Sequence, residues 1–446
     1  MKSFLRLTGY EFRKICMQPI ALILLVLFGI YGISTYYNVN MKNTPEEYQL
    51  YEHIGGSLTE ENYNILKKYA TADTQQPVAS DGVGDNEWIP TEMVEVTEWG
   101  ETYSKYVLES AFSRAENILK SEENRQRIMA QAQENIRKLE NDPDQKYDYR
   151  YNQMIYRQYA GRGEQLMMNY YGWTNYLEFN SVMRPVNLFD LTAFLLCIFA
   201  LCTVFARDYE NGIIPILHTS YRGRSTLHFA KILAGVLFSA LSLAILRILM
   251  IVTLMTNCDM SYVTAPVQSL GFYQNCPYNM SILQMIFFQY GVKLLFIVFL
   301  FLITILIGIL AKRSIISLIG SFVGLAGMTA LALRSDAGFY FEIITNQMPA
   351  PPDGQNYTSF WYENTMKIFN PAMVMRLNDY LEQYDYVNVL GFPVSRMALM
   401  ISFMVLLIVV LLIVTHGIYI RQGGGMPHRW ERKKGSTSEQ PSAHTA

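Results

Sequence analysis

Residues 205–231 carry the clearest chemistry in this sequence, and it suits protein contact rather than catalysis. The stretch lies between two strongly apolar runs and is charged at both ends. Glu210 can cap a helix or meet a basic group, and Gly212 permits a turn. An apolar edge follows, which can seat in a groove of a partner protein. The residues expected to act there are Glu210, Gly212, Ile213, Ile216, Leu217, Arg224 and Lys231.

Two further charges, Arg247 and Lys293, fall inside apolar runs. A charge inside a bilayer is costly, so it usually faces a cavity or a partner of opposite sign. One interpretation is structural, with snorkelling or an ion pair to Asp190. The other is a cationic vestibule that receives an anionic head group or a peptide carboxylate.

The sequence lacks the common catalytic motifs. It has no G-x-x-x-x-G-K-[ST] phosphate loop, no H-E-x-x-H, no G-x-S-x-G and no Cys/His spacing suited to zinc. We therefore expect no enzyme active site, no bound cofactor and no metal in this chain. Cys258 and Cys276 either form one disulfide or remain two thiols.

The surrounding elements must place residues 205–231 at a membrane surface. The chain has 446 residues, of which 51% are hydrophobic and 17% charged. A bilayer span needs about 20 apolar residues, and six such runs predict an all-α membrane protein with six transmembrane helices. A basic, amphipathic helix over residues 1–18 should lie in the interface before them. The six spans are expected at 19–37, 187–206, 232–255, 282–311, 314–333 and 397–420.

A polar domain over residues 38–186 separates the first two spans. Apolar positions at alternating steps of three and four predict a long helix with two charged defects. A second helix should pair with it, giving a hairpin over about 102–180 that projects as a stalk of roughly 55 Å. The apolar positions form a seam along the first helix. This seam either packs the domain's own core or docks a partner or substrate. The seam residues are Leu108, Ala111, Ala115, Ile118, Glu122, Arg125, Met129, Ala132, Ile136 and Leu139.

The distribution of Lys and Arg predicts the orientation, because short cytoplasmic loops are enriched in both. With both termini inside, residues 207–231 and the tail 421–446 are cytoplasmic, and the basic residues fall on that side. The polar domain, the loop 256–281 and the segment 334–396 are then extracytoplasmic. The loop 256–281 contains no Lys or Arg.

Residues 205–231 resemble the corresponding segment of the ABC-2-type permeases, and the start of the chain resembles theirs as well. The matching residues are Phe205, Glu210, Gly212, Leu217, Arg224 and Lys231, together with Phe4, Leu7, Glu11, Lys14 and Pro19. The resemblance implies an N-terminal elbow helix and a short coupling helix between spans two and three. One departure is Tyr221, which stands where the family usually has a proline.

The resemblance implies the membrane subunit of a bacterial ABC exporter, with a second permease subunit as a homo- or heterodimer. ATP and Mg²⁺ would bind in a separate cytosolic ATPase, and no nucleic acid is involved. Gly320 and Gly324 have the small-residue spacing that lets helices approach closely, either within the chain or in such a dimer. The rival interpretations are an ATPase-driven mechanotransmitter and an ATP-independent scaffold of secretion machinery.

Overall fold

Six long apolar helices form the body of the protein. The structure is a computed structural model that describes residues 2–37, 45–72, 92–140, 142–161, 166–168, 171–177, 188–217, 221–256, 258–333, 360–381 and 385–422. Six helical segments in this part of the chain are long and apolar enough to cross a membrane, which confirms the all-α membrane fold. They are α2 (Pro19–Tyr37), α9 with α10 (Leu188–Leu201 and Thr203–Glu210), α12 (Tyr221–Met255), α13 (Ile282–Ala311), α14 (Ser314–Leu333) and α17 (Arg396–Gln422).

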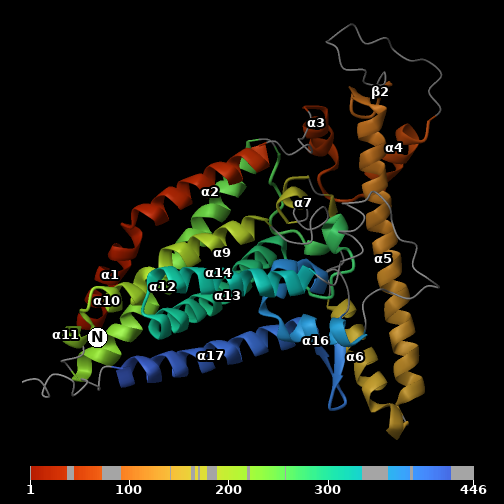
Figure 1. Ribbon diagram of the computed structural model, residues 1–446. Coiled ribbons are helices and arrows are strands. Elements are labelled where there is room, and N and C mark those ends of the chain that lie inside the picture. The colour runs from red at the N-terminus through yellow and green to blue at the C-terminus, as the bar shows by residue number, and fades with distance from the viewer. Residues whose placement is uncertain are drawn as a thin grey trace, which may run out of the picture.

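Two of these spans form the centre of the bundle. The apolar windows of α9–α10 and α13 are 67% and 56% buried, whereas those of α2, α14 and α17 are each 22% buried. Outer helices with so little burial present most of their side chains to the surroundings, as expected for lipid contact. α13 packs against α9, α10, α12, α14 and α17, so it is the helix around which the others gather (Figure 1).

The two ends of the bundle differ in what covers them (Figure 1). At one end lie α1 (Lys2–Cys16), the junction after α10, the turn between α13 and α14, and the end of α17. We call this the α1 end. The other end carries the polar domain and is called the polar-domain end.

The first helix, α1, packs along the beginning of α12 rather than lying apart from the bundle. Thr8, Glu11 and Ile15 share its buried face, at the spacing of one helical stripe. α12 begins at Tyr221 and not at residue 232 as expected. Hydropathy marks only the apolar part of a helix, whereas the polar first turns of α12 are stabilised by packing against α1.

The polar domain has its own small core and, among its described residues, two short antiparallel strand pairs beside its helices. Leu50, Leu66, Val96 and Leu108 are fully buried in this core. The elements are α3 (Pro45–Ile54), β1 (Gly56–Ser57), α4 (Glu60–Ala70), β2 (Met93–Val96), β3 (Glu101–Ser104), α5 (Lys105–Leu139), η1 (Pro143–Gln145), α6 (Lys146–Ala160), β4 (Met167–Met168) and α7 (Tyr171–Leu177). β1 pairs with β4, and β2 pairs with β3, both antiparallel.

The helical hairpin predicted from the seam is formed by α5 and α6. Its two charged defects pair with one another: Arg125 and Glu122 form a salt bridge of 2.6 Å. Arg125 also donates a hydrogen bond of 3.0 Å to the carbonyl of Tyr159 on α6. The second helix ends at Ala160, not near residue 180.

The hairpin does not project from the bundle as a stalk. In Figure 1, α5 runs across the ends of the spans. Arg150 of α6 donates to the carbonyl of Gly391 at 2.8 Å, and Gln158 donates to the Tyr386 hydroxyl at 2.7 Å. The seam periodicity predicted the helix but held no information about these long-range contacts, so the predicted projection is wrong.

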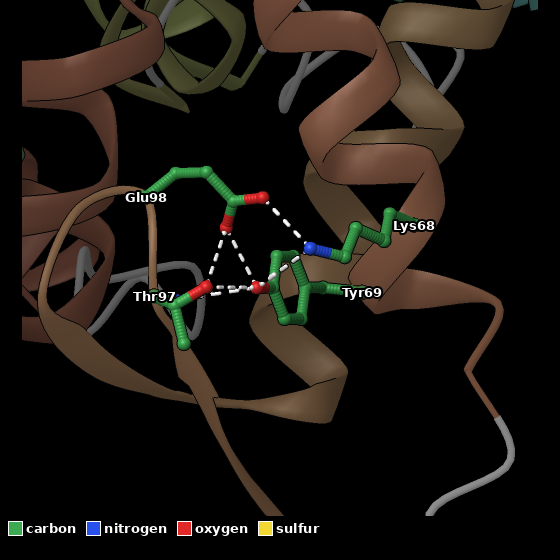
Figure 2. A network of polar contacts seen from close by, with 4 residues as sticks. All are labelled: Lys68, Tyr69, Thr97 and Glu98. Carbon is green, nitrogen blue, oxygen red and sulfur yellow. Dashed lines mark hydrogen bonds and ion pairs between the residues drawn. The ribbon is translucent and has the colours of Figure 1, made fainter.

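A polar network links α4 to the turn after β2 (Figure 2). Lys68 and Glu98 form an ion pair of 2.8 Å. The Tyr69 hydroxyl donates to the second carboxylate oxygen of Glu98 at 2.6 Å and lies 2.7 Å from the Thr97 hydroxyl. The ion pair holds the pKa of Glu98 at about 2, below its ordinary value of 4.5.

Short elements connect the spans at the polar-domain end. A β-hairpin precedes α17, where only short surface helices were expected between residues 334 and 396. The residues of the preceding 3₁₀ segment are mostly buried against α13, α14 and α17. The elements are η2 (Val267–Ser269), η3 (Gly271–Tyr273), α16 (Phe360–Phe369), η6 (Pro371–Tyr380), β5 (Tyr386–Val389) and β6 (Phe392–Ser395). Residues 334–359 and the tail from 423 lie outside the described residues.

Candidate functional site

A sharp turn at Gly212 ends the second span. The amides of Asn211, Gly212 and Ile213 donate to carbonyls of the last turn of α10 at 3.0, 3.1 and 3.2 Å. Gly212 has φ +65°, a left-handed conformation that costs other residues more than glycine. A Cβ at this position would meet nothing within 4 Å. The requirement for glycine is therefore conformational and not steric.

The apolar edge after the turn is narrower than expected. α11 (Ile214–Leu217) is a single helical turn, and Ile214 is buried. Ile213 and Leu217 are half-buried, whereas the Ile216 side chain is 70% exposed. Ile216 is thus the main apolar side chain that this segment offers to a partner.

Glu210 connects the Gly212 turn to the turn between α13 and α14, which lies at the same end of the bundle. Its carboxylate accepts hydrogen bonds from the amide of Ser314 at 2.6 Å and from the Ser314 hydroxyl at 2.9 Å. Ser314 is the first residue of α14, and the amide groups of a helix's first turn have no partner within the helix. Glu210 therefore caps α14 from another span, and its charge suits the positive end of that helix.

Near the turn lies a group of charges, the α1-end charge cluster, formed by the buried Glu11, Asp208 and Lys231 and the half-buried Lys14. Lys231 is 1% exposed; it pairs with Asp208 and donates to the carbonyl of Val204 at 2.8 Å. The Lys14 ammonium lies 3.7 Å from Asp208 and 3.9 Å from Glu11. The cluster joins α1, α10 and α12.

These contacts change the roles expected from the sequence. Lys231 is buried against Asp208, so it is not a surface contact, and Arg224 is half-buried. Asp208 was missed, although Leu201, Phe205 and Asp208 follow one inward stripe of the helix. That spacing could have distinguished Asp208 from the exposed Glu210. Ser314 carried no sequence signal, since its partner is about a hundred residues away.

A second buried group, the polar-domain-end charge cluster, consists of Asp190, Arg247 and Lys293. Asp190 of α9 is 1% exposed and pairs with Arg247 of α12. The Lys293 ammonium of α13 lies 2.9 Å from the other oxygen of the same carboxylate. Tyr176 of α7, whose pKa is raised by burial, reaches Arg247 from the polar domain. Arg247 and Lys293 thus pair with Asp190. This ion pairing was part of the structural interpretation, one of the two expected alternatives.

The remaining predicted residues have packing roles or lie open. A Cβ at Gly320 would come within 3.2 Å of Ile307 on α13, so Gly320 serves contact within the chain. A Cβ at Gly324 would meet nothing within 4 Å. Cys258 and Cys276 are buried thiols, so no disulfide joins them. Among the described residues, no group of three or more His, Cys, Asp or Glu could hold a metal ion.

A bundle of six apolar helices with buried ion pairs near both ends defines an α-helical, multi-pass membrane protein. The sequence profile of the ABC-2 family transporter protein matches residues 5–422. The chain therefore belongs to the ABC-2 transporter family and is a permease subunit of an ABC transporter. No curated protein and no solved structure matches the chain.

Proposed function

We propose that this chain is the membrane subunit of an ATP-driven exporter in the bacterial cell membrane. Two permease subunits form the pathway, and a separate cytosolic ATPase binds at the α1 end. ATP and Mg²⁺ bind in that ATPase. Closure of the ATPase pair moves the Gly212 turn and switches the pathway between inward and outward access.

The distribution of charge supports a cytoplasmic α1 end. Short cytoplasmic segments are rich in Lys and Arg, and the described segments of this end are basic. At the opposite end, the connecting loop 256–281 has neither residue. Both termini are then cytoplasmic. The basic residues of the α1 end include Arg6, Arg13, Lys14, Arg207, Lys312, Arg313 and Arg421.

The observation that carries the proposal is how the residues next to Ile216 are bonded to other helices. The exposed side chain sits on a short turn whose neighbours are fixed to other helices. Glu210 binds the start of α14, and Asp208 binds Lys231 of α12 and approaches Lys14 of α1. A force on Ile216 therefore reaches several elements at once, which is what coupling to a motor requires.

The test is a pair of matched substitutions at exposed apolar residues. Ile216→Asp should abolish co-purification of the ATPase and ATP-dependent activity, because it places a charge in the apolar contact. Leu390→Asp is the control, since Leu390 is 94% exposed at the tip of the β5–β6 hairpin, at the polar-domain end. Both variants should insert and fold.

Gly212→Val tests transmission separately from binding. A β-branched residue at φ +65° distorts the turn, so the ATPase should remain bound while hydrolysis is uncoupled from activity. Glu210→Arg should have the same effect, since it removes the acceptor for Ser314. Full ATP-dependent activity in both Gly212→Val and Ile216→Asp would show that this turn is not the coupling element.

A second function, mechanotransmission, is favoured by the placement of α5 and α6 across the span ends. In that case, the same ATPase would act, and the movement of the polar domain would be the output. Reconstitution in liposomes separates the two functions. Substrate flux that follows ATP hydrolysis supports export, whereas hydrolysis that moves the polar domain without flux supports mechanotransmission.

A further inference from the structure

An open groove lies beside the first turns of α17. Its volume is about 850 Å³, which is within the range of ligand sites in proteins. One wall is the β5–β6 hairpin, and the end of α16 and the face of α17 complete it. The apolar residues along the groove are Ile368, Phe369, Val389, Leu399, Phe403 and Leu406. Phe369 and Phe403 pack edge to face, with ring centroids 5.1 Å apart.

The groove continues into the membrane-spanning surface. Leu399, Phe403 and Leu406 belong to the apolar span Arg396–Arg421. From Arg396 to Leu406 the helix rises about 15 Å, which is half of a hydrocarbon core of about 30 Å. The groove therefore spans the depth of one leaflet and opens toward lipid. Leu406 is 57% exposed there, and the exposed surface of α17 continues beyond it to Ile413.

Two basic side chains, Arg396 and Lys367, lie at the polar end of the groove. Arg396 lines the groove, and its guanidinium lies 2.5 Å from a carboxylate oxygen of Asp385. Lys367 of α16 lies 3.7 Å from the other oxygen of Asp385. Both basic side chains lie at the level where α17 begins. The guanidinium of Arg396 can therefore bind an anionic group at the mouth of the groove.

We propose that this groove binds a membrane glycerophospholipid of the adjacent leaflet. One acyl chain lies along Leu399, Phe403 and Leu406, between α17 and the hairpin, and the phosphate lies near Arg396. The continuity with the lipid-facing surface of α17 identifies a bilayer lipid as the occupant. The inference requires only that α17 spans a bilayer, and it is independent of export.

Photo-crosslinking in nanodiscs tests the acyl chain position. The probe is phosphatidylglycerol with a diazirine on one acyl chain, and labelled peptides are mapped by mass spectrometry. Label should concentrate on residues 386–389 and 399–406. Ser402→Trp fills the groove and should lower this labelling about tenfold, which corresponds to a loss of one decade in affinity. Ile413→Trp is the control, because Ile413 is 68% exposed on α17 outside the groove.

Diacylglycerol with the same diazirine chain tests the role of the phosphate. It should label the groove much less than phosphatidylglycerol does. Equal labelling by both probes would overturn the phosphate site. Even labelling along α17 that Ser402→Trp leaves unchanged would show a general lipid annulus and overturn the proposal. A change from dimer to monomer in Ser402→Trp, without a change in labelling, would assign the groove to a second copy of the chain.

Discussion

The two buried charge clusters use the same plan at opposite ends of the bundle. Each places an aspartate of the second span against a basic residue of α12: Asp190 with Arg247, and Asp208 with Lys231. They differ in their balance of charge. The polar-domain-end cluster has one carboxylate for two cations, whereas Glu11 and Lys14 bring the α1-end cluster to two of each.

The difference predicts that the two clusters respond differently to the loss of a charge. A buried ion pair adds little net stability, but removal of one partner leaves an expensive buried charge. At the polar-domain end, Asp190 pairs with two cations and so joins α9, α12 and α13. At the α1 end, the Lys14 side chain is 38% exposed, and the second carboxylate allows charge to be shared. Rearrangement of that cluster should therefore cost less free energy.

Asp190→Asn should have the largest effect on stability. It leaves two buried cations without a carboxylate, so we expect a loss of about 3–5 kcal/mol. Unfolding of the purified protein in a detergent titration measures it. Asp148→Asn, at an exposed position of α6, is the control and should be neutral. Recovery of stability in the triple variant with Arg247→Gln and Lys293→Gln would attribute the loss to the uncompensated charge.

Asp208→Asn should destabilise less, by about 2 kcal/mol, because Glu11 and solvent near Lys14 compensate in part. The same detergent titration measures this loss. In contrast, ATP-dependent activity should fall more sharply for Asp208→Asn than for any variant of comparable stability. A larger loss of stability for Asp208→Asn than for Asp190→Asn would reverse the comparison between the clusters.

Lys293→Met should change stability by less than about 1 kcal/mol in either direction. Asp190 keeps Arg247 as its partner, and the desolvation cost of Lys293 disappears. Unfolding and ATP-dependent export are measured on the same preparation. Unchanged stability with lost export would instead support the vestibule, in which Lys293 receives an anionic group. Retained export would confine Lys293 to a structural role.

Glu98→Gln should have the smallest effect, because the pair with Lys68 is exposed. The pKa of Glu98 is lowered to about 2 from 4.5, so its contribution is present above pH 4.5 and is lost as the pH falls toward 2. Hydrogen exchange of the α4 peptides should be slightly faster in the variant than in the wild type at pH 6. The two proteins should differ less at pH 2.5. A constant difference at both pH values would contradict the assigned pKa.

Local patterns in the sequence predicted the elements that hydropathy and helical spacing define. The six spans, the amphipathic α1 and the long helix α5 follow from composition and periodicity. The turn at Gly212 was predicted because a glycine follows a charged helix end. The early start of α12 was not predicted, since its polar first turns are stabilised by contacts with α1, α10 and α17.

The partners of the charged residues could be predicted only in part. Asp190 was a predicted partner, because the two spans place opposite charges at similar depths. The sequence did not show that Arg247 and Lys293 share one carboxylate. The pairing of Glu210 with Ser314 depends on how the ends of two spans meet, and no local pattern records it. The same reason applies to the contact of α6 with the β5–β6 hairpin.

The length and position of α5 determine how far its end moves when the helix rotates. Arg114 and Ile118, in its first half, face Ser269 of the loop before α13 across a small cleft. Beyond them the helix, 35 residues long, continues with α6 packed beside it, and Arg150 of α6 is bonded to the β5–β6 hairpin. The helix is a lever arm: a rotation of about 5° would carry an end some 30 Å away through roughly 2.5 Å. Small tilts of the span ends are thereby amplified at the tip of the polar domain.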